Sequence, residues 1–161
     1  MPEVFVGCGS NIDPELHLRQ AVDGLAERFG PIRCSSVYRS PAFGFEGPDF
    51  LNLVVGFVST LGPDEIEAGL SGLESAFGRR EGERWSSRTL DLDLLLYGQR
   101  VDPARRVPRL DVLRYPFVLA PLAEIAPTLV HPLTGECMAN AWARCAEGAP
   151  ELFRLGTLDA A

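Results

Sequence analysis

The prolines of this chain divide it into two unlike parts. After Gly98 come Pro103, Pro108, Pro116, Pro121, Pro127 and Pro132, six prolines within 30 residues. Proline lacks a backbone N–H and interrupts the interior of helices and of central strands. Long regular elements are therefore confined to the first 97 residues, and the remainder can hold only short helices.

The first part alternates between strand and helix patterns. Short apolar runs bounded by turn residues predict strands at 3–8, 32–39, 50–60 and 89–97. Apolar residues at three- and four-residue spacing predict a helix over 14–29, capped by the Asp13 carboxylate and ended by Gly30. A second helix is predicted to begin at Pro63 and to end at Gly78.

The order strand–helix–strand–strand–helix–strand predicts an α+β fold, a ferredoxin-like split βαβ sandwich with a βαββαβ core. The second part would add a proline-rich C-terminal extension of short helices, at 117–125 and around 137–146. No repeat or linker interrupts the chain, and 161 residues suit one domain better than two. Residues 1–161 are therefore expected to form a single domain.

The charge inventory excludes several classes of protein. The net charge of −7 argues against sequence-independent binding to nucleic acid or to an anionic membrane. No apolar run approaches the ~20 residues of a membrane span, and the N-terminus lacks a signal-peptide pattern, so a cytoplasmic protein is expected. All 15 cationic side chains are Arg. Without Lys, phosphate would have to be bound by guanidinium groups, backbone amides and metal.

A cysteine-based metal site is not expected. Cys8, Cys34, Cys137 and Cys145 form no Cys-x-x-Cys pair, and His17 and His131 are the only histidines. A structural zinc site needs more closely spaced ligands than these. Free thiols in a reducing compartment are the better interpretation.

Two acidic residues interrupt the apolar strand at 89–97. Because alternate side chains of a strand share a face, one face would carry Leu90, Leu92, Leu94 and Leu96. Asp91 and Asp93 would point to the other face, about 7 Å apart at their Cα atoms. Carboxylates so placed can converge on one cation or straddle two, and oxygen ligands suit Mg²⁺. The alternative is a half-exposed strand whose Asp residues face water or pair with Arg.

A cationic loop precedes this strand. Residues 79–88 contain Arg79, Arg80, Arg84 and Arg88 around Trp85. Guanidinium groups beside a carboxylate-held metal can stabilise charge on a transferring phosphoryl group. Trp85 offers a flat surface for a heteroaromatic ring, or else anchors the loop to the core.

The spacing Arg84-Trp85-x-x-Arg88-x-x-Asp91-x-Asp93 resembles that of the 6-hydroxymethyl-7,8-dihydropterin pyrophosphokinases, enzymes of folate biosynthesis. Other motifs extend the resemblance from Gly7 to residue 135: Gly9-Ser10-Asn11, Tyr38-Arg39-Ser40-Pro41, Pro48-Asp49-Phe50-Leu51-Asn52 and the helix from Phe117 to Pro127. The resemblance implies the fold predicted above. It also implies an ATP-dependent diphosphotransferase that transfers pyrophosphate to the hydroxymethyl group of the pterin and releases AMP.

The resemblance further implies roles for individual residues. Asp91 and Asp93 would hold two Mg²⁺ ions against ATP, and Arg79 and Arg88 would neutralise charge during transfer. Phe50 and Phe117 would stack on the pterin and Asn52 would bond its edge. The full set of pterin contacts would be Ser40, Ala42, Phe43, Phe50, Asn52, Trp85 and Phe117. The ATP contacts would be Ser71, Glu74, Trp85, Arg88, Leu94, Arg105 and Arg109. Trp85 would sit on a loop that closes over both substrates.

The chain departs from the family pattern on the nucleotide side. Arg109 follows Pro108 where the family has His, and Arg109 is expected to replace its phosphate contact. The other departures are Leu110, Tyr115 in place of an Arg, with Arg114 displaced by one, and Ser71 in place of a glutamine. They leave open a second hypothesis, a catalytically degenerate paralogue that only binds pterin or nucleotide.

An RNA-binding module is disfavoured by the net charge and the acidic strand face. Small molecules are therefore the expected substrates, with dihydropteroate synthase as a functional neighbour.

Overall fold

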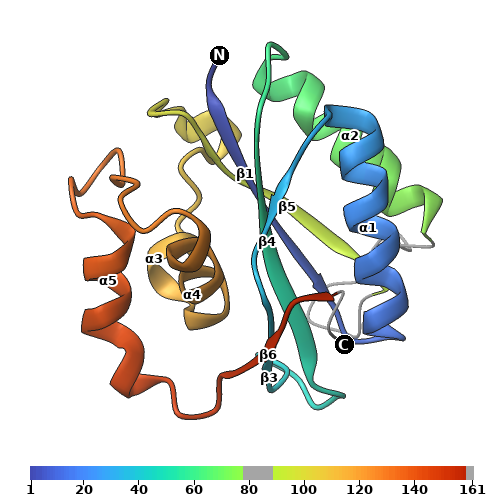
Figure 1. Cartoon of the computed structure of the whole chain (residues 1–161), viewed down its shortest axis with the longest axis vertical. Coiled ribbons are helices and arrows are strands. Elements are labelled where there is room, and N and C mark those ends of the chain that lie inside the picture. Colours follow the sequence, from blue (N-terminus) through green and yellow to red (C-terminus); the bar gives the residue numbers. More distant parts are fainter. Residues whose placement is uncertain (78–88, 159–161) are drawn as a thin grey trace.

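The computed structural model describes residues 1–77 and 89–158, which form an antiparallel sheet with helices on both faces (Figure 1). The strands lie in the order β5-β1-β4-β3-β6, and the short β2 also pairs with β4. Every pairing is antiparallel. The bounds are β1 Glu3–Ser10, β2 Arg33–Cys34, β3 Val37–Ser40, β4 Phe50–Val58, β5 Asp91–Tyr97 and β6 Phe153–Gly156.

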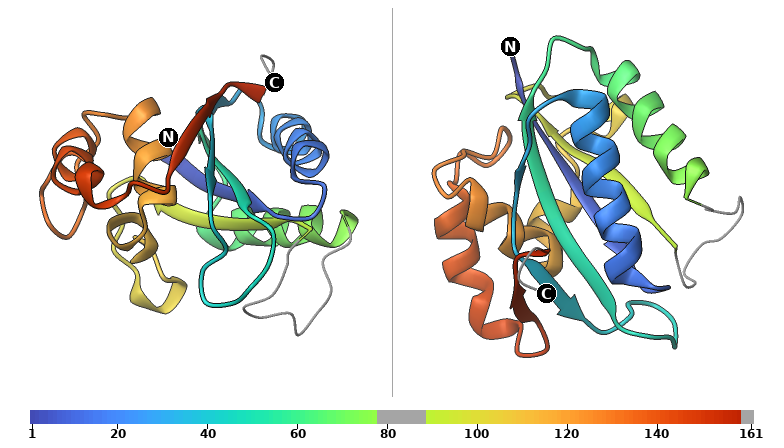
Figure 2. Two further views of the ribbon diagram at one scale, coloured as in Figure 1. Left: turned by 90° about the horizontal axis from the view of Figure 1, so that it is seen from below. Right: turned by 45° about the vertical axis from the view of Figure 1, so that its right-hand side comes forward.

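Two groups of helices cover the sheet from opposite sides (Figure 2). One face carries α1 (Pro14–Phe29) and α2 (Pro63–Ala76), and the other carries α3 (Asp111–Arg114), α4 (Pro116–Ile125) and α5 (Met138–Cys145). Short 3₁₀ helices occupy Pro103–Arg105 and Ala146–Gly148. Among the described residues, no helix has both the length and the apolar character needed to cross a membrane.

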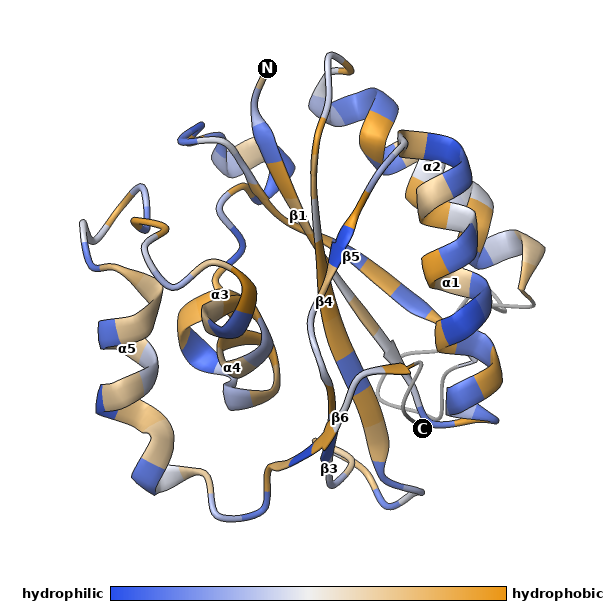
Figure 3. Ribbon diagram, in the orientation of Figure 1, coloured by the Kyte–Doolittle hydropathy of each residue, from blue (hydrophilic) through white to orange (hydrophobic). Residues whose placement is uncertain are grey.

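The alternation of β1 explains why the sheet has an apolar core on each side. Val4, Val6 and Cys8 belong to the core with α1 and α2, whereas Phe5 belongs to the core with α4 and α5. Figure 3 shows β1, β4 and β5 as mainly hydrophobic along their central lengths. Each large side chain buried there stabilises the fold by about 1.5–3 kcal/mol. The sheet is thus the rigid layer shared by both cores.

The expected strand at 32–39 is two strands, β2 and β3, separated by Ser35 and Ser36. Ser35 donates its backbone N–H to the Val54 carbonyl at 2.9 Å, and its hydroxyl accepts the Val54 N–H at 2.9 Å. The serine side chain therefore replaces one backbone partner of β4. Periodicity cannot show this interruption, because it depends on the facing strand.

The prediction that Leu96 shares a face with Leu92 and Leu94 is wrong. The pairing of β1 with β5 shifts register between Phe5 and Val6, so that Phe5 pairs with Leu96 and Val6 with Leu94. This bulge places Leu96 in the core with α4 and α5, opposite to Leu92 and Leu94. Asp91 and Asp93 precede the bulge in the strand, and their side chains point to the face that was predicted.

Two further expectations are corrected near the termini of elements. Asp13 has a left-handed backbone, with φ of 43°, and its carboxylate makes no capping hydrogen bond to α1. Its carbonyl instead accepts the His17 N–H at 3.1 Å. The second correction is β6, which was not expected and pairs with β3. Gly78, the expected end of the second helix, lies outside the described residues.

Candidate active site

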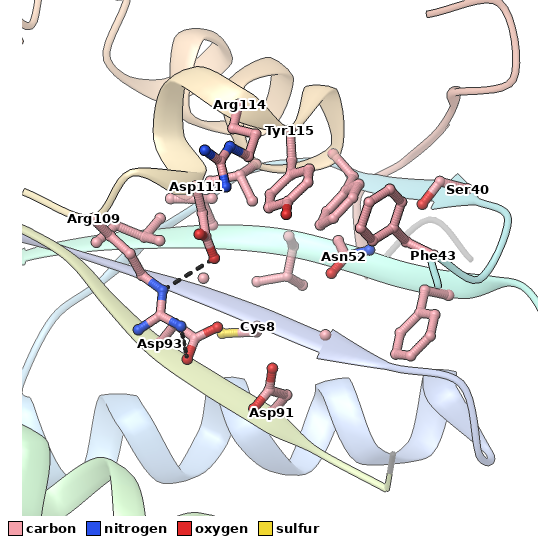
Figure 4. Close-up of a pocket in the computed structure, with 18 of the residues that line it drawn as sticks. Cys8, Ser40, Phe43, Asn52, Asp91, Asp93, Arg109, Asp111, Arg114 and Tyr115 are labelled. Atoms are coloured by element: carbon pink, nitrogen blue, oxygen red, sulfur yellow. Dashed lines mark hydrogen bonds and ion pairs between the residues drawn. The ribbon is translucent and has the colours of Figure 1, made fainter. Parts of the chain in front are cut away.

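A cleft of about 670 Å³ opens on the α3 and α4 side of the sheet (Figure 4). Its lining comes from β1, β3, β4 and β5, from the turn after β3, and from the segment that leads into α4. Eight of the residues expected from the sequence meet here: Ser40, Phe43, Phe50, Asn52, Asp91, Asp93, Arg109 and Phe117. The sheet and two connections, the turn after β3 and the segment between β5 and α4, thus gather positions that are distant in the sequence.

The floor of the cleft is formed by paired residues of three strands. Gly9 on β1 pairs with Asn52 on β4 and with Asp91 on β5. Directly paired residues of antiparallel strands project to the same face. The amide of Asn52 and the carboxylate of Asp91 therefore flank a position that has no side chain.

The acidic end of the cleft is electrostatically strained. Burial, together with the negative charge of Asp91, raises the pKa of Asp93 to about 7, although the positive charge of Arg109 opposes the rise. The Arg109 guanidinium lies 3.5 Å from an Asp93 oxygen and donates to Asp111 at 3.1 Å. One guanidinium is thus shared by two carboxylates, so this face favours additional positive charge.

Arg109 is aimed at the strand by its own backbone. Its N–H donates to the Leu95 carbonyl at 2.9 Å, which fixes the connection against β5. Burial works against the Arg109 charge, but Asp93 and Asp111 outweigh it and hold the Arg109 pKa above its usual range. Arg109 therefore stays charged, and it already has partners in the protein.

Aromatic rings gather at the other end of the cleft. Tyr115 and Phe117 stack at a centroid distance of 5.2 Å with ring planes 11° apart. Phe43 lies tilted against Tyr115 at 5.2 Å, and Phe45 meets Phe50 edge-on at 6.1 Å. Rings of this kind offer flat faces for a planar ligand. Figure 4 shows Tyr115, Phe43 and Asn52 at this end and Asp91 and Asp93 at the other.

A polar network fastens α4, which carries Phe117, to the sheet. The Glu124 carboxylate accepts the Tyr38 hydroxyl at 2.8 Å and the Ser36 N–H at 2.9 Å. The Ser36 hydroxyl donates to it as well, at 3.1 Å, and Arg154 of β6 lies 3.5 Å away. Burial raises the pKa of Tyr38, and its hydrogen bond to Glu124 adds to the rise. The aromatic end of the cleft therefore rests on a fixed support.

Several expected nucleotide contacts lie outside the cleft. Ser71 is exposed on α2, while the Leu94 side chain is buried in the core with α1 and α2. Glu74 is buried, and its carboxylate accepts the Leu92 N–H at 3.0 Å. Glu74 therefore fixes β5 from the side of the sheet that α2 covers. Ala42, expected at the pterin, belongs to the turn beside Phe43 but does not line the cleft.

Arg105 lies in a second hollow of about 510 Å³, lined by Asp64, Glu67, Ala104, Arg105, Arg106 and Arg109. Its guanidinium donates to both Asp64 oxygens, at 2.7 and 2.9 Å, and to Asp102 at 2.8 Å. Arg106 and Arg109 line this hollow and the main cleft alike. The two spaces are therefore neighbours along the same connection. Arg79, Arg88 and Trp85, expected to act at the site, lie outside the described residues.

Sequence reasoning missed Asp111, Arg106 and Phe45 as cleft residues. Asp111 had a local signal, because it follows Arg109 by two residues at the start of α3. Arg106 and Phe45 sit in turns, where no periodicity indicates a direction. The remaining histidine of interest, His131, is structural: its Nδ1 accepts the Leu133 N–H at 3.2 Å. The four cysteines are free thiols.

The donor set of the cleft suits a metal ion that is shared with a phosphate ligand. Within the described residues, no three His, Cys, Asp or Glu side chains are grouped so that they could hold a metal ion. Two carboxylates are available on one face, and Mg²⁺ commonly takes one or two carboxylates with waters and substrate phosphates. Asp91 and Asp93 fit that requirement, because burial and their mutual repulsion make a second negative charge unfavourable without a cation.

Comparisons with known proteins agree with this chemistry. The family model of 7,8-dihydro-6-hydroxymethylpterin-pyrophosphokinase matches residues 5–127. A 2-amino-4-hydroxy-6-hydroxymethyldihydropteridine pyrophosphokinase of Synechocystis sp. is 46% identical over 136 residues, covering 81% of this chain and 70% of that protein. The enzyme of the same name from Aquifex aeolicus is 34% identical over 137 residues, covering 83% and 86%.

Solved structures show the same fold. The Plasmodium falciparum HPPK-DHPS A437G protein with SDX-DHP superposes with a TM-score of 0.76 at 10% identity, covering 95% of this chain and 48% of that one. This chain thus spans about half the length of that protein, and the likeness concerns the fold alone. Paired carboxylates on a strand face can hold a metal-bound polyphosphate, and the aromatic slot beside them suits a planar ligand, so the site is that of a transferase joining the two. The chain belongs to the 7,8-dihydro-6-hydroxymethylpterin-pyrophosphokinase family.

Proposed function

We propose that the cleft binds both substrates of the family's reaction, so that this enzyme transfers pyrophosphate from ATP to the hydroxymethyl group of 6-hydroxymethyl-7,8-dihydropterin and releases AMP. One observation carries the proposal: an aromatic, amide-bearing end and a carboxylate–guanidinium end meet in one cleft. The first suits a flat heteroaromatic ring, and the second suits a polyphosphate held with metal. No observation on this chain favours the inactive alternative.

At the aromatic end, the pterin would lie between Phe50 and Phe117, with Asn52 bonding its polar edge. The backbone of the turn from Ser40 through Ala42 to Phe43 would bond the remaining edge. Main-chain amides suit such a ring because donors and acceptors alternate around it. The Glu124 network would keep Phe117 in place when the ligand arrives, which lowers the cost of ordering the site.

At the acidic end, Asp91 and Asp93 would hold two Mg²⁺ ions together with oxygens of ATP. When bound, the metal would neutralise charge on the transferred group. The raised pKa of Asp93 supports this assignment. It shows that the two negative charges repel each other, and a cation that replaces the proton would remove this repulsion.

The nucleotide would extend from Asp93 along the edge of β5 toward the second hollow. Arg109 and Arg105 would contact the phosphates and the nucleoside, and the position of both residues at that hollow supports this path. Ser71 and Glu74 lie on α2 and Leu94 lies on β5, so any contact that they make with ATP would come from the edge of the sheet. Arg79, Arg88 and Trp85 keep the roles implied by the family resemblance, as proposals.

In the reaction, the pterin hydroxyl oxygen attacks the β-phosphorus of ATP. The bond between the β-phosphorus and the bridging oxygen of the α-phosphate breaks, and AMP leaves with that electron pair. The hydroxyl proton passes to solvent or to a phosphate oxygen. The residues of the cleft contribute mainly by aligning the two substrates and by stabilising charge.

We also propose that the described strands β1 to β5, with α1 and α2, form a ferredoxin-like unit within a single domain. The spatial order β5-β1-β4-β3 and the two helices on one face support this classification. Dihydropteroate synthase is proposed as the functional neighbour. The pea relative, named folate synthesis bifunctional protein, is 36% identical over 134 residues, which are 80% of this chain and 26% of that protein.

The proposed function is tested by incubating the protein with ATP, Mg²⁺ and 6-hydroxymethyl-7,8-dihydropterin. AMP should form in equal amount to the pyrophosphorylated pterin, and omission of the pterin or addition of EDTA should abolish it. Formation of ADP, or AMP formation without pterin, would contradict the assignment of the reaction.

A further inference from the structure

Gly9 lies at the boundary between the two ends of the cleft. It pairs with Asn52 on one neighbouring strand and with Asp91 on the other, so all three positions form one row across the sheet. The residue therefore separates the amide proposed to bind the pterin from a carboxylate proposed to bind metal.

The carboxamide of Asn52 lies directly over this glycine. A Cβ atom at position 9 would be 2.5 Å from Asn52 Oδ1 and 3.6 Å from Asn52 Cγ. Real Cβ atoms do not approach another heavy atom as closely as 2.5 Å. Any side chain at position 9 would therefore force the Asn52 amide to rotate away or would move β4.

Of the two glycines that line the cleft, only Gly9 has so close a neighbour. Gly7, the other glycine of the cleft floor, would place a Cβ 3.5 Å from the Leu95 side chain, which is ordinary van der Waals contact. Backbone conformation does not explain Gly9, because it pairs regularly on both sides within β1. The need at position 9 is for space above the strand.

We propose that Gly9 is a positioning residue for the pterin: its missing side chain lets the Asn52 amide lie across β1 and face the bound ring. This inference rests on the proposed function of the cleft. Gly9 acts through Asn52 and does not itself bond the substrate. Its effect is therefore expected on pterin recognition and much less on nucleotide binding, which occurs along β5.

The test measures pterin affinity by calorimetry in the presence of Mg²⁺ and a non-hydrolysable ATP analogue. Gly9→Ala should weaken pterin binding at least about tenfold, with the affinity for the analogue alone changed less than about twofold. In an Asn52→Ala background, Gly9→Ala should cause no further loss, because the amide it displaces is already absent. An equal loss in both backgrounds, or unchanged pterin affinity, would overturn the proposal.

Gly56→Ala serves as the matched control. Gly56 is also a glycine of the β1–β4 ladder, and a Cβ there would lie 2.9 Å from the Phe5 ring, away from the cleft. This variant should lose stability yet bind pterin normally. A parallel loss of pterin affinity in Gly56→Ala would show that general crowding of the sheet explains the result, and would overturn the proposal.

A measurement on the unaltered protein covers the case in which Gly9→Ala does not fold. In a crystal structure of the unaltered protein with bound pterin, the Asn52 carboxamide should lie over Gly9 and bond the ring, and an amide directed away from Gly9 would contradict the proposal. Failure of the proposed function is distinguishable, because the wild-type protein would then bind no pterin and release no AMP.

Discussion

Glu124 and Asp93 are two carboxylates on the same side of the sheet, and their side chains are similarly exposed, at 22% and 29%. Glu124 is well supplied with donors: Tyr38, the Ser36 N–H and the Ser36 hydroxyl all bond it within 3.1 Å. Asp93 has the negative charge of Asp91 beside it and shares its guanidinium with Asp111.

The difference teaches how one chemical group serves two purposes. A carboxylate whose charge is met by fixed donors stabilises the fold. A carboxylate placed beside another carboxylate, with too little positive charge nearby, is unfavourable in free energy while it is ionised. The binding of a cation relieves that repulsion and is therefore favoured. Exposure does not distinguish the two cases, whereas the partners do. The comparison therefore predicts separable effects on activity and on stability.

The largest effect is expected from the carboxylates of the cleft. Asp91→Asn and Asp93→Asn should each lower the rate of AMP release by at least about 100-fold, equivalent to ~2.7 kcal/mol. The amide cannot neutralise a metal ion, and no third metal-ligating side chain is grouped with this pair among the described residues. Steady-state assays at saturating Mg²⁺ measure this, and retention of more than about a tenth of the wild-type rate would count against shared metal binding.

The converse effect is expected from Glu124. Glu124→Ala should reduce the free energy of unfolding by about 2–3 kcal/mol, because it leaves the Tyr38 hydroxyl and the Ser36 N–H without their acceptor. Urea denaturation measures the loss, with Glu147→Ala as the control because Glu147 is exposed. Glu124→Gln should lose less, since its carbonyl oxygen can still accept. Equal stability of the Glu124→Ala and Glu147→Ala variants would refute the structural role.

Arg109 links the acidic end to the nucleotide path, so its removal should have an intermediate effect. Arg109→Ala should weaken binding of an ATP analogue about tenfold, ~1.4 kcal/mol, and less at high salt. Arg144→Ala is the control. Arg144 is an exposed residue of α5 that pairs with Glu136, which lies just before that helix. Unchanged affinity would confine Arg109 to its ion pairs with Asp93 and Asp111.

The smallest effect is a pH dependence of stability in the metal-free protein. Because the folded pKa of Asp93 is about 7 and the ordinary value is 3.8, the folded state retains a proton that the unfolded state releases. Between these two pKa values stability should therefore fall as pH rises, by about 1 kcal/mol after allowance for partial exposure.

Denaturation in EDTA at pH 4.5 and at pH 8 measures this dependence. Asp93→Asn should be the more stable protein at pH 8 and should show the smaller loss between the two pH values. Addition of Mg²⁺ should stabilise the wild-type protein at pH 8 more than at pH 4.5, because the metal competes with protons. Parallel stability profiles of the two proteins would contradict the prediction.

The sequence alone determined the features that depend on neighbouring residues. Alternation placed Asp91 and Asp93 opposite Leu92 and Leu94, and the helical spacing predicted α1 and α2, because a strand or helix repeats its faces over a few residues. The spacing of the Arg, Trp and Asp residues indicated the family. The presence of the aromatic residues and Asn52 in one cleft was implied by the resemblance and is seen in the structure.

The tertiary structure decided what depends on the facing strand or on a distant side chain. The bulge opposite Phe5 turned Leu96 to the other core, and Ser35 divided an expected strand. The pairing of Arg109 with two carboxylates and the closeness of Asn52 to Gly9 likewise required the register of three strands. Local periodicity fixes which face a side chain takes within its own segment. Register and side-chain partners are set by long-range contacts between segments. They therefore cannot be derived from the sequence of any one segment.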